Sequence, residues 1–82
     1  MIMTAEITMY PFQEDFVPPI QAFIDKLGAA GTVRVDTFPT CTVLVGEYEA
    51  IMDVLKASMA WSHQALGRAA FVCKFIPGYQ AD

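Results

Sequence analysis

Apolar and polar residues alternate along the first part of the chain. Residues on one side of the alternation are Ala5, Ile7 and Met9, and residues on the other are Glu6, Thr8 and Tyr10. A repeat of two residues is typical of a strand that buries one face. The pattern therefore predicts a strand over Met3–Tyr10, which Pro11 ends.

Two later segments show the three- and four-residue spacing of helices. The first is predicted over roughly residues 18–28, with Pro18 and Pro19 in its first turn, where a missing N–H costs little. Gly28 and Gly31 provide its stops. The second is predicted from Tyr48 to about Ala65, a segment without Gly or Pro.

Three further strands follow from β-branched and alternating residues. They are predicted over Thr32–Phe38, Cys41–Glu47 and Ala69–Ile76. The element order is then βαββαβ, which is typical of the ferredoxin-like split βαβ fold. We expect one α+β domain over residues 1–82, a four-stranded antiparallel sheet with both helices on one face.

The first and third strands are expected at the centre of this sheet, which leaves the sheet's other face open. Polar residues expected on that open face are Glu6, Thr8, Tyr10, Arg34, Asp36 and Lys74.

Composition adds a prediction about assembly. Of the 82 residues, 55% are hydrophobic and only 17% are charged, which is more apolar than an average soluble domain. A domain of this length hides only about 60–65% of the surface that its unfolded chain exposes. We therefore expect subunits to associate, as a homodimer or homotetramer, and to bury part of the apolar surface between them.

Charge and segment length exclude several partners. The net charge is −4 and no cluster of basic residues occurs, which argues against nucleic acid. The longest stretch without a charged residue, Ala57–Gly67, has 11 residues, whereas a bilayer needs roughly 20. No membrane partner is expected. The first basic residue is Lys26, so no secretory signal is evident and a cytoplasmic location is expected.

The residues that most often carry chemistry form no catalytic or metal-binding pattern. Cys41 and Cys73 are 32 positions apart in β-prone segments, which favours buried reduced thiols. His63, the single histidine, has no Cys, Asp or Glu three or four residues away. Ser58 and Ser62 are expected to bond back to helix carbonyls. We predict no metal, no cofactor and no catalytic residue.

Some residues remain candidates for binding a small molecule. Glu6 lies mid-strand on the expected open face, where a carboxylate can accept hydrogen bonds from an amino-heterocycle, or can simply pair with Arg34 or Lys74. Tyr10 and Tyr48 each lie at the end of an element beside a turn, where pockets form. Their rings can stack on a flat ligand, although core packing is the commoner use of an aromatic side chain.

Several blocks of the sequence resemble the small YkoF-like proteins that bind thiamine or its hydroxymethylpyrimidine moiety. The blocks are Ala5-Glu6-Ile7-Thr8-Met9-Tyr10-Pro11, Val17-Pro18-Pro19-Ile20 with Ala22-Phe23-Ile24, Val45-Gly46-Glu47-Tyr48 with Ile51-Met52, and Phe71-Val72-Cys73-Lys74-Phe75. The resemblance covers nearly the whole chain. It implies the split βαβ fold, association of subunits through their sheets, and reversible binding of a small heterocycle without catalysis.

The resemblance also points to particular site residues. It makes Glu6 and Thr42 the expected polar anchors, and Tyr10 and Tyr48 the expected stacking surfaces, for thiamine, hydroxymethylpyrimidine or a near relative. Relatives often carry a Ser-Thr-Gln-like stretch before the glycine of the third strand, and the corresponding residues here are Cys41, Thr42 and Val43. Fewer polar side chains are thus available at this point.

Two other interpretations stay open at the level of sequence. In the first, the protein is a structural or regulatory oligomerisation module whose open sheet face joins its twin and binds no ligand. The apolar composition supports this interpretation equally well. In the second, it is a small cofactor-free oxygenase that uses Trp61 and His63, although the sequence offers no paired acid and base for such a reaction.

Overall fold

The computed structural model describes residues 1–82 and has the predicted element order. Its elements are β1 (Ile2–Pro11), α1 (Val17–Ala29), β2 (Arg34–Thr37), β3 (Thr42–Glu47), α2 (Tyr48–Leu66) and β4 (Ala69–Pro77). Most boundaries lie within one residue of those predicted, while β2 is shorter than the predicted segment. The difference arises because Thr32 and Val33 belong to the connection from α1 rather than to the paired strand.

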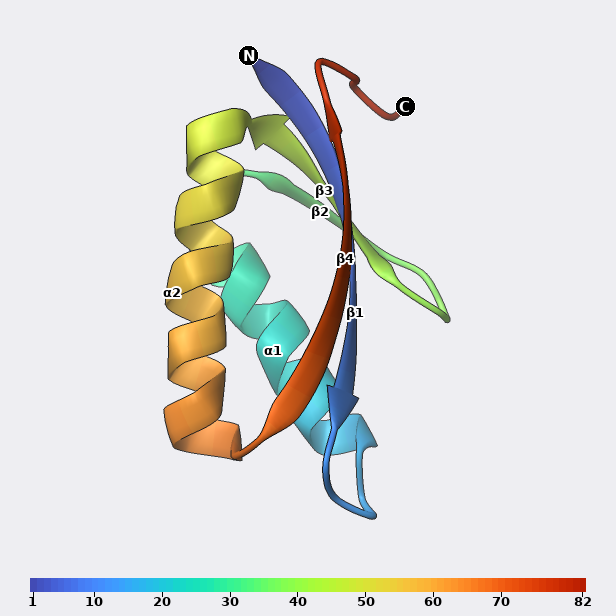
Figure 1. Cartoon of the computed structure of the whole chain (residues 1–82), viewed down its shortest axis with the longest axis vertical. Helices are drawn as coiled ribbons and strands as arrows, with labels where there is room; N and C mark the ends of the chain where they lie inside the picture. Colours follow the sequence, from blue (N-terminus) through green and yellow to red (C-terminus); the bar gives the residue numbers. More distant parts are fainter.

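The four strands form one antiparallel sheet in the order β2-β3-β1-β4. Both helices cover the same face, with α1 against β1 and β2 and α2 against β3 and β1 (Figure 1). This is the predicted α+β arrangement with β1 and β3 at the centre. Neither helix combines the length and the apolarity that a membrane crossing requires.

The core lies between the helices and one face of the sheet. The odd-numbered residues of β1 from Met3 to Met9 are all buried there, as the alternation predicts. Phe23 and Leu27 of α1 enter from one side, and Leu55 of α2 enters from the other. The rings of Phe23 and Phe71 lie 4.9 Å apart between centroids, which links β4 to the core.

Backbone chemistry sets the ends of the helices. Pro18 and Pro19 occupy the first turn of α1, as predicted. Gly28 lies inside this helix, so the expectation that it acts as a stop is wrong. The chain instead leaves the helix at Gly31, whose φ of 68° is the left-handed conformation that glycine adopts most readily. At the end of α2, Gly67 has a φ of 94° and turns the chain into β4.

The open face of the sheet is partly covered by the end of the chain. Gly78 turns the chain after β4, and the segment from Tyr79 to Ala81 then crosses the sheet (Figure 1). Thr4 donates a hydrogen bond of 2.7 Å to the Tyr79 carbonyl and accepts one of 3.0 Å from the Ala81 N–H. Arg34 on β2 donates to the Ala81 carbonyl at 2.7 Å. The open face is therefore free only toward the other end of β1.

Two buried serines differ from expectation. The Ser58 and Ser62 hydroxyl oxygens lie on the inner face of α2 and have no hydrogen-bond partner. The predicted bonds back to helix carbonyls are absent, so these small side chains act as spacers between α2 and the core.

The sheet's two faces yield a test of this architecture. Leu44 is fully buried beneath the helices, whereas its neighbour Val43 lies half-buried on the opposite face, beside Glu6. We expect Leu44→Ala to lower the free energy of unfolding by about 2–5 kcal/mol because it leaves a cavity. Val43→Ala, the matched control, should cost less than half as much in the same urea titration. A larger cost at Val43 would mean that the two faces are reversed.

Candidate functional site

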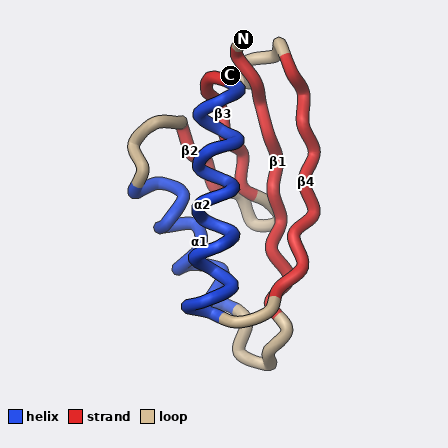
Figure 2. Tube along the Cα trace, turned by 60° about the vertical axis from the view of Figure 1, so that its left-hand side comes forward, coloured by secondary structure: helices blue, strands red, loops and turns tan.

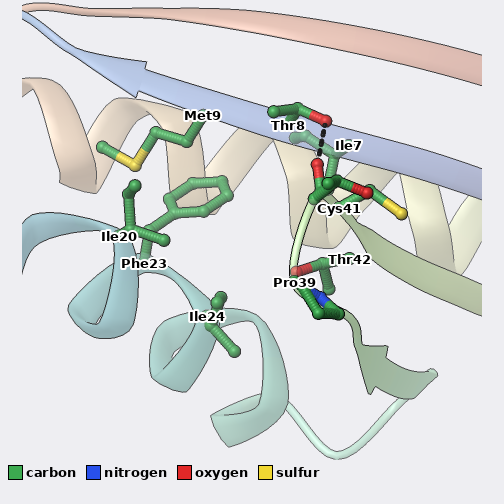
Figure 3. A pocket seen from close by; sticks show the side chains of 10 residues that line it. Ile7, Thr8, Met9, Ile20, Phe23, Ile24, Pro39, Cys41 and Thr42 are labelled. Carbon is green, nitrogen blue, oxygen red and sulfur yellow. Dashed lines mark hydrogen bonds between the residues drawn. The ribbon is translucent and has the colours of Figure 1, made fainter. Parts of the chain in front are cut away.

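A cleft lies between α1, the second half of β1 and the turn that joins β2 to β3. It consists of an inner and an outer pocket that share the residues Thr8, Met9, Ile20, Pro39 and Thr40. We call the two together the hairpin cleft. Figure 3 shows its inner part, with side chains of α1 on one side and hairpin residues on the other.

The inner pocket is small and mostly apolar, with a volume of about 80 Å³. Ile7 and Phe23 belong to the buried core, so the pocket ends on a rigid surface. Ile24 of α1 faces the hairpin across it (Figure 3). Pockets that enclose a drug-sized ligand usually have roughly 300–1,000 Å³. The inner pocket therefore accepts only part of such a molecule.

The outer pocket provides the remaining space, with a volume of about 450 Å³. Its additional lining residues are Tyr10, Pro11 and Phe16, at the end of β1 and just before α1. Tyr10 and Phe16 are each 54% exposed, so their rings are available to a ligand and are not part of the core. An aromatic ring or a cation can lie against such surfaces.

The hairpin that forms one wall is held in place by two hydrogen bonds. The Phe38 N–H donates to the Cys41 carbonyl at 2.9 Å and closes the turn at Pro39 and Thr40. The Thr8 hydroxyl donates to the Thr40 carbonyl at 3.1 Å and ties the turn to β1 (Figure 3). The wall is thus fixed against the central strand before any ligand arrives.

Within the hairpin cleft, Thr42 is a buried polar side chain whose hydroxyl makes no hydrogen bond to the rest of the protein. It is only 5% exposed, it lines the inner pocket, and no side-chain hydrogen bond of the structure involves its hydroxyl. Thr4 is equally buried, yet its hydroxyl makes both of the bonds that hold the chain's end. Because buried polar groups are normally paired, the Thr42 hydroxyl is available to a molecule in the pocket.

The hairpin cleft carries no formal charge. None of its lining residues is Asp, Glu, Lys, Arg or His, and no group of three metal-ligating side chains occurs anywhere in the structure. Cys41 lines the inner pocket, whereas Cys73 lies outside it, and both are free thiols. Burial raises the pKa of the Cys73 thiol, so this group stays protonated at neutral pH.

Of the four site residues predicted from the sequence, the structure brings two together. Thr42 lines the inner pocket and Tyr10 the outer one. Glu6 lies on the open face between Val43 and Lys74, whose ammonium group is 4.0 Å from its carboxylate. Glu6 and Thr42 lie on opposite faces of the sheet. Thr42 pairs with Ile7 and shares its helix-side face, whereas Glu6 pairs with Val43 on the open face.

Tyr48 lies at the far end of the sheet. Its N–H donates to the Met1 carbonyl at 2.8 Å, and the preceding Glu47 is paired with Ile2. Tyr48 therefore lies beside the start of β1, whereas Tyr10 lies near the end of β1. The two tyrosines do not share a site within one chain.

Sequence reasoning missed the cleft residues supplied by α1 and the hairpin. The helical spacing predicts α1 but does not show that Ile20 and Phe23, in its first turns, also line a cleft. Phe16, at the N-terminal end of the helix, is an exposed aromatic residue two positions before the first of two prolines, Pro18 and Pro19. An exposed aromatic residue beside a helix that begins with prolines was the sequence signal that could have indicated the cleft.

Comparison with known proteins shows that the chain matches one protein family. The profile of the YkoF-related family matches residues 2–72 of the chain. A Thermotoga maritima structure, provisionally assigned to thiamine biosynthesis or salvage, is 26% identical and has a TM-score of 0.82. That alignment covers 92% of this chain and 82% of the Thermotoga chain. No curated protein matches the sequence.

More distant structures share the fold. A Streptococcus pneumoniae protein is 23% identical, with a TM-score of 0.77 and coverage of 96% of this chain and 89% of that one. A Bacillus cereus domain of unknown function is 18% identical, with a TM-score of 0.71 and coverage of 100% and 83%. These likenesses concern the fold alone.

The two buried threonines allow a matched test of the site. Thr42→Val should leave the free energy of unfolding within about 1 kcal/mol of the original, because no hydrogen bond is lost. Thr4→Val should lower it by about 1–3 kcal/mol, because it leaves the Tyr79 carbonyl and the Ala81 N–H unpaired. Thermal and urea unfolding measure both variants, and an equal loss for the two would show that the Thr42 hydroxyl has a structural partner.

Proposed function

Because the chain belongs to the YkoF-related family, we propose that it reversibly binds the aminopyrimidine half of thiamine, free or within thiamine itself. The proposed site is the hairpin cleft, and binding involves no catalysis. The Thermotoga relative's provisional assignment to thiamine biosynthesis or salvage supports this choice of ligand.

The observation that carries the proposal is the free hydroxyl of Thr42 in a narrow apolar pocket. An aminopyrimidine is a flat ring with neighbouring donor and acceptor groups on one edge. A hydroxyl can both donate and accept a hydrogen bond, so Thr42 suits either group. The apolar surfaces of Ile7 and Phe23 match the faces of the ring.

The sizes of the two pockets suggest an orientation for the ligand. The inner pocket, of about 80 Å³, accommodates one edge of the pyrimidine beside Thr42. The outer pocket, of about 450 Å³, has room for the thiazolium ring of thiamine beside Tyr10 and Phe16. A cation over an aromatic face contributes roughly 0.5–2 kcal/mol, depending on how far it is desolvated.

The charge of the cleft favours unphosphorylated ligands. Phosphate groups are normally held by Arg, Lys or helix N–H groups, and no basic side chain lines either pocket. The whole chain has a net charge of −4, which further opposes an anion. The cleft also lacks a carboxylate or imidazole that would serve as general acid or base, which supports binding rather than turnover.

Isothermal titration calorimetry with hydroxymethylpyrimidine, thiamine and thiamine diphosphate tests the proposal. We expect heat from the first two and weaker binding of the diphosphate. Thr42→Val should weaken both unphosphorylated ligands by about 0.5–1.5 kcal/mol, the net value of one hydrogen bond. The absence of heat with all three compounds at millimolar concentration would refute the proposal.

Two further variants distinguish a ligand bound in the hairpin cleft from a ligand bound on the open face of the sheet. Tyr10→Ala should weaken thiamine more than hydroxymethylpyrimidine, because only thiamine carries the cation placed in the outer pocket. Glu6→Gln should leave both affinities unchanged, since Glu6 is outside the cleft. The opposite pattern, loss with Glu6→Gln and none with Thr42→Val, would move the ligand to the open face.

A further inference from the structure

A second hollow lies on the helix layer, between the end of α1 and the middle of α2, and we call it the helix groove. Figure 2 shows both helices on one side of the sheet, where they pack against each other. The groove has a volume of about 360 Å³, and small-molecule sites usually have roughly 300–1,000 Å³. Its lining residues are Lys26, Ala29, Ala30 and Thr32 from α1 and the connection after it, and Asp53, Val54, Ala57 and Ser58 from α2.

Two side chains of opposite charge line this groove without neutralising each other. Lys26 lies in the last turn of α1, and Asp53 lies in the first half of α2. The ion pairs of the chain all lie elsewhere. The Lys26 ammonium group instead lies over the ring of Trp61, 5.4 Å from the ring centroid. Each of the two charges is therefore available to a molecule from solution.

The directions of the helices give the groove a negative and a positive end. α1 and α2 run in opposite directions, so the C-terminal end of α1 lies against the first half of α2 (Figure 1). A helix C-terminus carries partial negative charge, to which the Asp53 carboxylate adds a full one. Trp61, beneath the Lys26 ammonium group, lies about two helical turns after Asp53 along α2. The positive charge is thus displaced from the negative end.

Ser58 supplies an unpaired hydrogen-bonding group in the same groove. The residue is only 1% exposed, and its hydroxyl has no hydrogen-bond partner. The Ser62 hydroxyl is also unpaired, but Ser62 lines no pocket. Buried polar groups are normally paired, and a serine hydroxyl both donates and accepts. The Ser58 hydroxyl therefore suits either an ammonium or a carboxylate group of a ligand.

We propose that the helix groove binds a small amino acid in its zwitterionic form. The ligand's carboxylate lies at Lys26 and its ammonium group lies at Asp53, with Ser58 as a further hydrogen-bonding partner. The apolar surfaces of Val54 and Ala57 contact its hydrocarbon part. A molecule with one charge leaves the opposite charge of the groove unpaired, so it binds more weakly than a zwitterion.

This inference is independent of the ligand proposed for the hairpin cleft. The two sites share no lining residue, so a failed titration with thiamine compounds and a failed titration with amino acids have separate meanings. The helices cover the face of the sheet opposite to the open face, so association of subunits through their open faces leaves the groove uncovered (Figure 1).

Trp61, the single tryptophan of the chain, provides a fluorescence test, because a carboxylate that draws Lys26 away from the ring changes its emission. The zwitterionic probes are L-valine and 4-aminobutyrate, whose charged groups have different spacings. Isovalerate and isobutylamine, which are L-valine without its ammonium group and without its carboxylate, are the matched controls. At least one zwitterion should have a dissociation constant about tenfold lower than either control, the equivalent of one charged hydrogen bond. No fluorescence change with either zwitterion at millimolar concentration would overturn the proposal.

Charge variants place the ligand in the helix groove, with isothermal titration calorimetry as the measurement. K26M and D53N each remove one charge from the groove, and both should raise the dissociation constant of the zwitterion about fivefold or more. K56M and D25N make the same changes in net charge on the same two helices but outside the groove, and they should leave the constant unchanged. Equal effects of the groove variants and their controls would overturn the proposal.

Ser58→Ala separates a ligand contact from a structural role. Its hydroxyl has no partner within the protein, so the variant should keep the free energy of unfolding of the original chain. The same variant should raise the dissociation constant of the zwitterion about threefold. Unchanged affinity in S58A, K26M and D53N together would overturn the proposal, and circular dichroism checks that each variant is folded.

Discussion

The register between β1 and β3, in which Ile7 lies opposite Thr42, determines what each face of the sheet presents. It places the odd-numbered residues of β1 beneath the helices and sends Glu6 to the open face. A slip of one residue would exchange the two faces and expose the core. The same register puts a threonine hydroxyl at the helix side of the sheet, in a place where the surrounding residues give it no partner. The hairpin cleft depends on this placement.

The rest of the cleft follows from how short elements are joined to that central pair. Thr8, two residues before Tyr10, reaches the Thr40 carbonyl and holds the hairpin against β1. Pro18 and Pro19 allow α1 to begin close to the same end of the strand, so its first turns face the hairpin. In this small domain the same residues serve both purposes: Ile7, Met9 and Phe23 belong to the hydrophobic core and also line the cleft.

The sequence predicted the fold well because its signals are local. Alternation along β1, helical spacing in α1 and the absence of breakers in α2 each follow from a few neighbouring residues. Register is a long-range property, and no local pattern states that Thr42 faces Ile7. For that reason Glu6 and Thr42 were predicted to act together, although the structure puts them on opposite faces. The hydrogen bonds between Thr4 and the end of the chain could not be predicted from local patterns either, because Thr4 and Tyr79 are 75 positions apart in the sequence.

The central claim is that Thr42 and its apolar neighbours hold an aminopyrimidine inside the hairpin cleft. Amide chemical shifts in a ¹H–¹⁵N NMR titration with hydroxymethylpyrimidine test it most directly, because they locate the ligand residue by residue. The account predicts the largest changes at Thr8, Thr40 and Thr42, with Val43 and Lys74 changing least. Changes centred on the open face around Glu6 and Lys74, with Thr42 unaffected, would contradict it.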